Sequence, residues 1–536
     1  MSTGSGAHLR ESTDPVAASG DRDGLSSGVV TAASLDDGAD TATDGVLVLI
    51  AALCRSLEAD RVRYCHWKSN ESIARSASGE NDLDLLVARA DAERFELILR
   101  RLGFKDTDQP AWKRLPGIYH SYGLDPTGVF VHIHAHYQLV IGDDMTKNIH
   151  LPIEVPYLAS ARSEGTFPIP STAFELLLFL IRMVVKHSTW DAFVSFQGSV
   201  SKSERRELED LVERTDLHEV WELAERHLPF IPRELLERCL RCVQPGASRW
   251  LQIRTASRLQ HALAGCSRRP PVLDTGLRMW RRGRTVLRRK VLRRGPVTSR
   301  MSSGGALVAI VGGDGAGKTT VVDGLSSWLA SEHIDSSTMH MGKPSWSALT
   351  AIVKGSLKLA AATKRTSTSS AKALRSSLST GEGGLTVRNR ARLVWEVLTA
   401  RDRFRTYRRA RRLATNGAIV ICDRYPLPEV SLMDGAVTGR LQDPSALGRW
   451  AAWLAGLERR YYERIRDPDT LIVLRVDPDT AVERRRGIEP ESSVRPRSEE
   501  IWGIDWSGTP AIVIDAASPR DDVLSEVKAT IWSRLS

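Results

Sequence analysis

The spacing of apolar residues in the C-terminal part of the chain predicts strands that alternate with helices. Continuous apolar runs at Ala306–Val311, Ala418–Cys422, Leu471–Val476 and Ala511–Ile514 are typical of buried strands. Apolar residues recur at helical spacing at Val321, Val322, Leu325, Trp328 and Leu329, and again at Val523, Leu524, Val527, Ile531 and Leu535. This alternation predicts an α/β domain over residues 305–536, with a parallel sheet covered by helices on both faces.

The preceding part of the chain has a mixed pattern. Helical spacing begins near Val46, and candidate strands lie at Leu83–Val87 and Val129–Leu139. Helical, leucine-rich segments follow at Phe174–Val185 and through residues 204–242. We therefore expect a separate α+β domain at 44–266.

Composition changes this picture at the N-terminus. Residues 1–43 are rich in Ser, Thr, Gly, Ala and Asp and lack aromatic residues, which predicts a disordered acidic tail. A Ser/Thr/Ala/Lys-rich stretch at Lys364–Gly384 is expected to be a mobile loop. The N-terminus shows no secretory signal, and the longest apolar run, Val46–Cys54, is too short to span a bilayer. Six scattered cysteines suit a reducing compartment, so we expect a cytoplasmic protein.

The net charge of +10 is concentrated in one segment. Residues 267–300 hold twelve Lys/Arg and one acid, while residues 1–44 have a net charge of −6. This distribution argues against a nucleic-acid-binding surface on the folded domains, and no specific nucleic acid is expected. The linker 267–304 interleaves its arginines with apolar residues over 277–294, which favours peripheral contact with an anionic membrane at its inner face. Two alternatives are a nucleic-acid phosphate contact with Trp280 stacking and a solvated linker.

A glycine-rich segment follows the first predicted strand of the C-terminal domain. It reads GGDGAGKTT and fits the pattern G-x-x-x-x-G-K-[ST] between a strand and a helix. Glycines let successive backbone N–H groups turn toward phosphate oxygens, and the helix N-terminus adds partial positive charge. Lys318 is expected to reach the β- and γ-phosphates of ATP, and the Thr319 hydroxyl to bind Mg²⁺. The predicted nucleotide-binding residues are Gly312, Gly313, Asp314, Gly315, Ala316, Gly317, Lys318, Thr319 and Thr320.

Three further segments accompany this loop. Ala400–Arg403 lies on an amphipathic helix, Asp423-Arg424-Tyr425 ends a buried strand, and Val513–Ala516 ends the last strand. Together with the loop they resemble thymidylate kinase over residues 305–536. The resemblance implies a P-loop kinase that uses ATP and Mg²⁺ and phosphorylates a nucleoside monophosphate, dTMP or a related one, or another phosphorylated acceptor.

The resemblance also implies roles for individual residues. Asp314 would lie beside the acceptor phosphate and the metal, and Arg424 would clamp that phosphate. Asp423 would act on Mg²⁺ directly or through water, and Arg403 would help to hold the acceptor. A lid would follow the fourth strand, where the chain carries several arginines, including Arg484 and Arg495, which are the predicted catalytic ones. A solvated basic helix face is the alternative interpretation of these arginines.

The chain differs from thymidylate kinases in the segments that recognise the nucleotide base of the acceptor. The family carries Arg-Glu-Pro-Gly-Gly-Thr after the second strand, whereas this chain reads HMGKPSW at His340–Trp346. Pro426 and Pro428 stand where the family begins a Ser-rich helix that reads thymine. The acceptor therefore stays open, as does the oligomeric state, with a homodimer among the options. A regulatory P-loop ATPase and a bifunctional kinase and nucleotidyltransferase are the alternative functions.

The N-terminal domain contains an Asp-x-Asp pair on a predicted strand. Asp82 and Asp84 are two residues apart, so their side chains point to the same face and are a possible second metal site. The pair resembles the metal-binding element of the nucleotidyltransferase superfamily, but the glycine before it and the third carboxylate are missing.

Histidines and cysteines add two weaker signals. His132, His134 and His136 share a strand face, yet one tetrahedral metal would need side chains from elsewhere to complete its shell. A pair of these histidines with Asp82 or Asp84 is one option, and packed or hydrogen-bonded histidines are the other. Cys239 and Cys242 have helical spacing without a second pair, which predicts core thiols.

Overall fold

The computed structural model describes residues 45–163, 165–188, 200–293, 295, 297–342, 350, 387–430 and 448–535. The predicted acidic tail 1–43 and the predicted loop Lys364–Gly384 lie outside the described residues.

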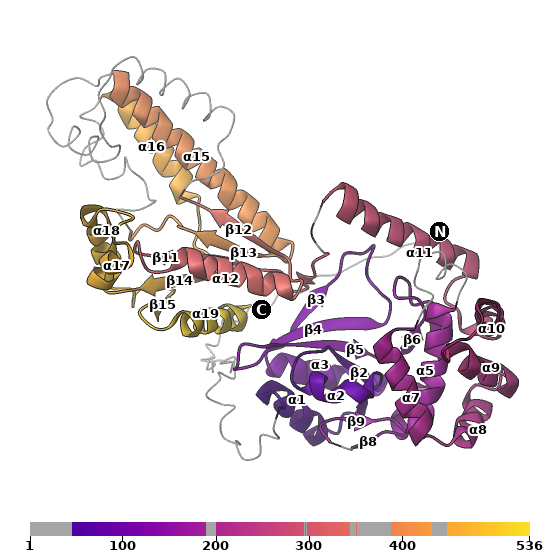
Figure 1. The fold of residues 1–536 in the computed structure, drawn as a ribbon. Helices are drawn as coiled ribbons and strands as arrows, with labels where there is room; N and C mark the ends of the chain where they lie inside the picture. Colours follow the sequence, from indigo (N-terminus) through magenta and orange to yellow (C-terminus); the bar gives the residue numbers. More distant parts are fainter. Residues whose placement is uncertain are drawn as a thin grey trace, which may run out of the picture.

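A six-stranded mixed sheet organises the N-terminal part (Figure 1). Its strands, in spatial order, are β1 (Tyr64–His66), β2 (Leu83–Val87), β5 (Phe130–His136), β4 (Ile118–Leu124), β3 (Lys105–Asp108) and β10 (Arg300–Met301). β2 and β5 pair in parallel and the other neighbours are antiparallel. Helices α1 (Val48–Ala59) and α3 (Ala92–Arg101) share a core with the apolar residues of β2 and β5, so one sheet face is closed by these helices. The predicted strand Val129–Leu139 is divided between β5 and β6.

A helical layer follows this sheet. It consists of α5 (Thr172–His187), α7 (Lys202–Arg214), α8 (Leu217–His227), α9 (Arg233–Val243) and α10 (Arg249–Ala262). Smaller elements connect sheet and helices: α2 (Ile73–Ala77), β6 (Leu139–Ile141), β7 (Ile149–Leu151), α4 (Glu154–Ala159), β8 (Arg162–Ser163) and β9 (Pro168–Ile169). α5 is buried along nearly its whole length and contacts α7 to α10 (Figure 1). Cys239 and Cys242 of α9 are buried free thiols in this core, as their helical spacing predicts.

The C-terminal part contains the predicted parallel sheet. Its strands, in spatial order, are β12 (Ser336–His340), β13 (Ile419–Asp423), β11 (Leu307–Gly312), β14 (Thr470–Arg475) and β15 (Ala511–Asp515). The helices are α12 (Lys318–Ser331), α15 (Val387–Thr415), α16 (Arg449–Glu463), α17 (Pro478–Arg484), α18 (Glu491–Gly503) and α19 (Arg520–Arg534). Alternate residues of β11 enter two different cores, with Val308 and Ile310 in one and Leu307 and Ala309 in the other. Both faces of the sheet are therefore covered, which is why the sequence of β11 is a continuous run of apolar residues.

The two sheets are joined by direct contacts. β10 belongs to the predicted linker, yet it pairs with β3 and extends the first sheet. Phe130 of β5 stacks on Trp328 of α12, with ring centroids 4.6 Å apart, and also contacts Trp532 of α19. The indole N–H of Trp532 donates to the carbonyl of Gly103 at 3.2 Å. A shared apolar core thus connects the face of β4 and β5 to α12 and α19.

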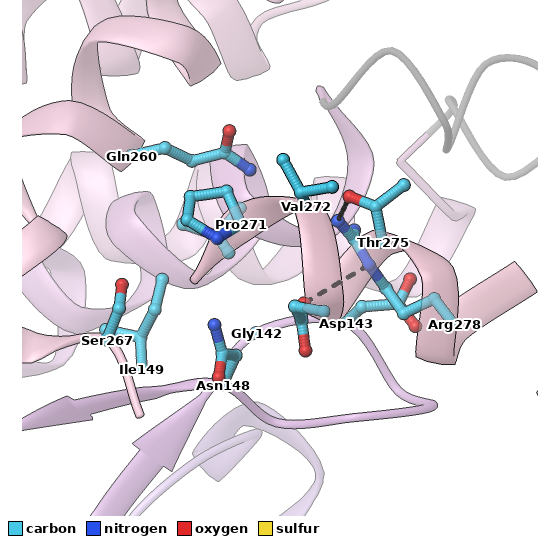
Figure 2. A pocket seen from close by; sticks show the side chains of 12 residues that line it. Gly142, Asp143, Asn148, Ile149, Gln260, Ser267, Pro271, Val272, Thr275 and Arg278 are labelled. Carbon is cyan, nitrogen blue, oxygen red and sulfur yellow. Dashed lines mark hydrogen bonds and ion pairs between the residues drawn. The ribbon is translucent and has the colours of Figure 1, made fainter. Parts of the chain in front are cut away.

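The basic linker forms a helix, α11 (Pro271–Val286), which continues into a π-helical turn at Leu287–Val291. The buried residues of α11 are polar: Asp274, Arg278 and Arg281. Arg278 lies 3.3 Å from Asp274 and donates to the Thr275 hydroxyl at 2.9 Å (Figure 2). The helix therefore packs on the domain through its polar side. In the described part of the chain, no helix combines the length and apolar character needed to cross a membrane.

Candidate phosphate-binding site

The strand, loop and helix predicted from the sequence are present in the structure. β11 ends at Gly312 and α12 begins at Lys318. Gly315 and Gly317 have φ angles of +89° and +80°, a conformation that L side chains rarely adopt. A Cβ atom on Gly315 would also lie 2.7 Å from the carbonyl oxygen of Ala481. The loop geometry therefore requires glycine at this position.

Lys318 is buried against the loop that precedes it. Its ammonium donates to the carbonyls of Gly312 at 2.9 Å and Gly313 at 2.8 Å. Burial lowers the pKa of Lys318 to about 8, although Asp314 and Asp423 oppose the shift. The ammonium is thus charged at neutral pH and is held by neutral oxygens, which phosphate oxygens can replace with a gain in charge pairing.

Asp314 is a buried carboxylate inside the loop, with 1% of its surface exposed. Arg497 of α18 donates to its Oδ2 at 2.5 Å, and Arg424 lies 3.5 Å from its Oδ1. Burial alone would raise the pKa of Asp314, but the hydrogen bond from Arg497 and the nearby positive charges hold it below its ordinary value. The side chain is therefore an anion that ties the loop to α18.

The end of β13 brings Asp423 and Arg424 to the same edge of the sheet. β13 pairs in parallel with β11, with Ile310 opposite Asp423. The Oδ1 atom of Asp423 is buried and has no hydrogen-bond partner among the described residues. Arg424 has a φ of +58°, a left-handed conformation that is uncommon for a residue other than glycine.

These elements surround a cavity of about 650 Å³. Its lining includes residues of the loop and α12 (Gly315, Ala316, Gly317, Lys318, Thr319 and Thr320), residues at the ends of β12 and β13 (His340, Asp423 and Arg424), and Arg484, Arg485, Ala516, Ser518 and Arg520. Most of the predicted nucleotide-binding residues therefore meet at one place. Ala516, the residue directly after β15, also lines this cavity.

The predicted arginines divide into two groups. Arg424 and Arg484 line the cavity, and Arg484 also donates to the carbonyl of Ala516 at 2.9 Å. Arg495 lies elsewhere, 2.7 Å from Asp479 and 2.9 Å from Glu491. Arg403 is buried and donates to the carbonyls of Met341 at 3.0 Å and Gly342 at 3.2 Å. These two arginines were predicted to be catalytic, but in the structure they are engaged with protein groups away from the cavity lining.

Two further basic residues of this site belong to the predicted arginine-rich lid, and one was not predicted. Arg485 of the lid lines the cavity, and Arg497 of the lid holds Asp314. Arg520, which was not predicted, also lines the cavity. The run of arginines after β14 was a visible signal, but sequence spacing did not show which of them faces the loop. Arg520 is the first residue of α19 and follows Pro519, a helix-start signal that carries no indication of a phosphate site.

A second polar cluster lies on the face of the N-terminal sheet opposite α1 and α3. Asp82 Oδ1 is 2.8 Å from His132 Nδ1, and Asp84 Oδ1 is 2.8 Å from the ammonium of Lys68 and 3.3 Å from His134 Nδ1. Burial would raise the pKa of Asp84, but the Lys68 charge and the imidazole hydrogen bonds hold it well below its ordinary value. The two carboxylates therefore stay ionised, each paired with imidazole groups.

Another cavity, of about 260 Å³, lies where α11 meets the N-terminal domain. Figure 2 shows its lining, with Asp143 and Asn148 near the β6–β7 hairpin and Pro271, Thr275 and Arg278 on α11. Arg282 also forms an ion pair with Asp143. This ion pair holds α11 against the β6–β7 hairpin.

Comparison with known proteins shows that the chain is distantly similar to two curated relatives and to a solved structure. No family model matches the chain. The chain is 29% identical over 136 residues to the uncharacterized ATP-binding protein YghR of Escherichia coli strain K12, and equally to YghR of Escherichia coli O6:H1. The match covers 24% of this chain and 51% of each relative, so the chain spans about half the length of the curated relatives it matches. Among solved structures, a thymidylate kinase from Candida albicans aligns with 42% of this chain and 91% of its own, at 16% identity and a TM-score of 0.27.

The arrangement itself defines the fold of the C-terminal part. A parallel sheet with a central strand, a glycine-rich loop and a helix that begins at Lys-Thr is a P-loop α/β fold.

Proposed function

We propose that residues 305–536 form an ATP- and Mg²⁺-dependent phosphotransferase of the thymidylate-kinase-like type, which moves the γ-phosphate of ATP to a phosphorylated acceptor. The observation that carries the proposal is the convergence of the loop, the end of β13 and two arginines at the C-terminal end of α17 on one cavity. These residues include Asp423, Arg424, Arg484 and Arg485. Its volume of about 650 Å³ suits a small ligand. The name of the YghR relatives, which are called ATP-binding, agrees with this proposal.

Phosphoryl transfer depends mainly on positioning and on neutralising charge. In the proposed mechanism the backbone of the loop and Lys318 bind the ATP phosphates, and Lys318 exchanges its two carbonyl partners for phosphate oxygens. Arg424 clamps the phosphate of the acceptor from the edge of β13. Arg484, Arg485 and Arg520 line the same cavity and would stabilise the charge that spreads over the transferring group.

The residues at the cavity fit a magnesium ion. Thr319 lines it, and the buried Oδ1 of Asp423 has no hydrogen-bond partner among the described residues. Hydroxyl and carboxylate oxygens are the ligands that Mg²⁺ prefers. When bound, Mg²⁺ would neutralise charge on the β- and γ-phosphates.

The alternative functions are less well supported by these contacts. A regulatory ATPase needs no acceptor clamp, whereas Arg424 is held at the cavity in a strained backbone conformation. A second, nucleotidyltransferase activity would need a third carboxylate near Asp82 and Asp84. The neighbouring strand β5 instead places His134 opposite Asp84.

We expect dTMP to be a poor acceptor compared with another phosphorylated compound. After Tyr425 the chain forms no helix through Val430, and Pro426 has no N–H to donate to a base. A pocket without groups that hydrogen-bond to the base discriminates weakly among nucleotide bases. The measurement is kcat/KM for ATP-dependent phosphorylation across nucleoside monophosphates and sugar phosphates. A strong, selective preference for dTMP would contradict the prediction, and ATP hydrolysis that no acceptor stimulates would favour the ATPase.

A further inference from the structure

The face of the N-terminal sheet opposite α1 and α3 carries imidazoles from two neighbouring strands. β4 and β5 pair so that His120 stands directly opposite His134, and β2 places Asp84 on the other side of His134. His132 is two residues before His134 and shares its face. Three imidazoles from two strands therefore meet beside two carboxylates.

We propose that His120, His132 and His134 bind one divalent transition-metal ion of the Zn²⁺ class. Each residue offers one ring nitrogen, and these three atoms all lie within 4.8 Å of one another. His120 Nδ1 and His132 Nε2 are 3.2 Å apart. Two ligands of a tetrahedral zinc ion with bonds of about 2.0–2.1 Å are separated by roughly 3.3 Å. The spacing is thus that of two ligands on one ion.

The carboxylates orient these imidazoles. His132 uses Nδ1 for Asp82, which leaves Nε2 for the metal. His134 Nδ1 lies 3.3 Å from Asp84 Oδ1, so its Nε2, 3.6 Å from Asp82 Oδ2, is the nitrogen that can turn toward the metal. A carboxylate on the far ring nitrogen is the usual partner of a metal-bound histidine, because it fixes the tautomer and makes the ligand more basic.

The donor set selects the kind of ion. Three imidazole nitrogens suit Zn²⁺, Cu²⁺, Ni²⁺ or Fe²⁺, whereas Mg²⁺ requires oxygen ligands. Three protein ligands leave a fourth position open, next to the half-exposed Asp82. His136 does not belong to the site, because it is buried against Trp67 and approaches Asp84.

The test is metal binding by the full chain, freed of any polyhistidine tag and stripped with a chelator. Titration calorimetry with Zn²⁺, and Co²⁺ titration followed by its visible absorption, are expected to show one high-affinity ion per chain with a tetrahedral spectrum. The double variant His132→Ala/His134→Ala should lose more affinity than the roughly 10- to 100-fold that an orienting residue contributes. His218→Ala, an exposed histidine on α8, should bind as wild type does.

Asp82→Asn covers the case in which the double variant does not fold, because Asp82 is half-exposed. It should fold normally by circular dichroism and bind Zn²⁺ about 10- to 100-fold more weakly. The proposal is overturned if the wild-type chain binds no Zn²⁺ or Co²⁺ at one per chain. It is also overturned if Mg²⁺ competes on equal terms, or if binding is unchanged in folded His132 and His134 variants and in Asp82→Asn.

A separate observation concerns the outer side of α11. Leu273 and Trp280 of α11 and Leu287 of the following π-helical turn recur every seven residues. This spacing places them on a different side of the helix from the buried Asp274, Arg278 and Arg281. They are 64%, 51% and 50% exposed. Arg288, Arg289 and Lys290 follow within the next turn. An amphipathic helix thus turns its apolar side away from the protein and ends in a basic cluster.

We propose that this side of α11 binds the surface of an anionic lipid bilayer. Apolar side chains can enter the headgroup boundary while the arginines and the lysine meet anionic headgroups. In vesicle co-sedimentation, the full chain should bind phosphatidylserine-containing vesicles, and less so at high salt. Trp280→Ser/Leu287→Ser should weaken binding by at least about tenfold.

The matched control is Trp250→Ser, which removes an exposed tryptophan from α10 and should leave binding unchanged. Equal binding to neutral vesicles would overturn the proposal, because the basic cluster would then play no part. Binding that survives the loss of Trp280 and Leu287 would also overturn it, as would capture of RNA in place of vesicles.

Discussion

Replacing Lys318 with alanine is expected to reduce ATP turnover by at least about 10²-fold, because a single preorganised donor to a transferring group contributes that much or more. The ammonium lies at the cavity beside the loop, where it donates to the carbonyls of Gly312 and Gly313. The fold should be retained, because the loop geometry is set by the backbone of Gly315 and Gly317. The measurement is ATP consumption in the presence of an acceptor mixture.

Lys202→Ala provides the matched control, since this lysine is exposed on α7 in the other part of the chain. Its turnover should equal that of wild type. A folded Lys318→Ala protein, judged by its melting curve, that turns over ATP at the wild-type rate would remove the kinase proposal.

The second large effect is expected at Arg424. Arg424→Ala should lower kcat/KM for the acceptor by roughly 10²-fold or more, since a charge-assisted clamp held in the transition state contributes a few kcal/mol. The guanidinium lies at the cavity, 3.5 Å from Asp314. The KM for ATP should change much less, because the proposed binding site for that nucleotide is the loop and Lys318. Steady-state kinetics with each substrate varied in turn make the comparison.

The backbone at Arg424 calls for a second variant. The φ angle of Arg424 is +58°. Alanine would remain strained at this angle, whereas glycine adopts it readily. Arg424→Gly should therefore lose as much acceptor activity as Arg424→Ala while keeping the geometry of the turn. Arg405→Ala, an exposed arginine on α15, should behave as wild type. Full acceptor activity in Arg424→Gly would show that the guanidinium is not the clamp.

Several features of this protein followed from local sequence patterns. The run Leu307–Gly312, the glycines and the helix that starts at Lys318 can be recognised without tertiary information, because each depends on neighbours along the chain. The amphipathic character of the linker helix was also visible. Its orientation was not, since only packing against Asp143 and Met145 decides that the polar side faces inward.

Tertiary structure alone decided which distant side chains meet. Arg497 and Asp314 are far apart in sequence, and their contact depends on how α18 packs on the loop. Arg495, two residues away, lies beside Asp479 instead, because neighbouring residues on a helix point in different directions. The contacts of His120 could not be predicted from the sequence either. Its strand gives no sign of a ligand, and only the register of β4 on β5 brings it to His132 and His134. Sequence periodicity determines which face a side chain occupies, whereas strand order and helix packing determine what it meets there.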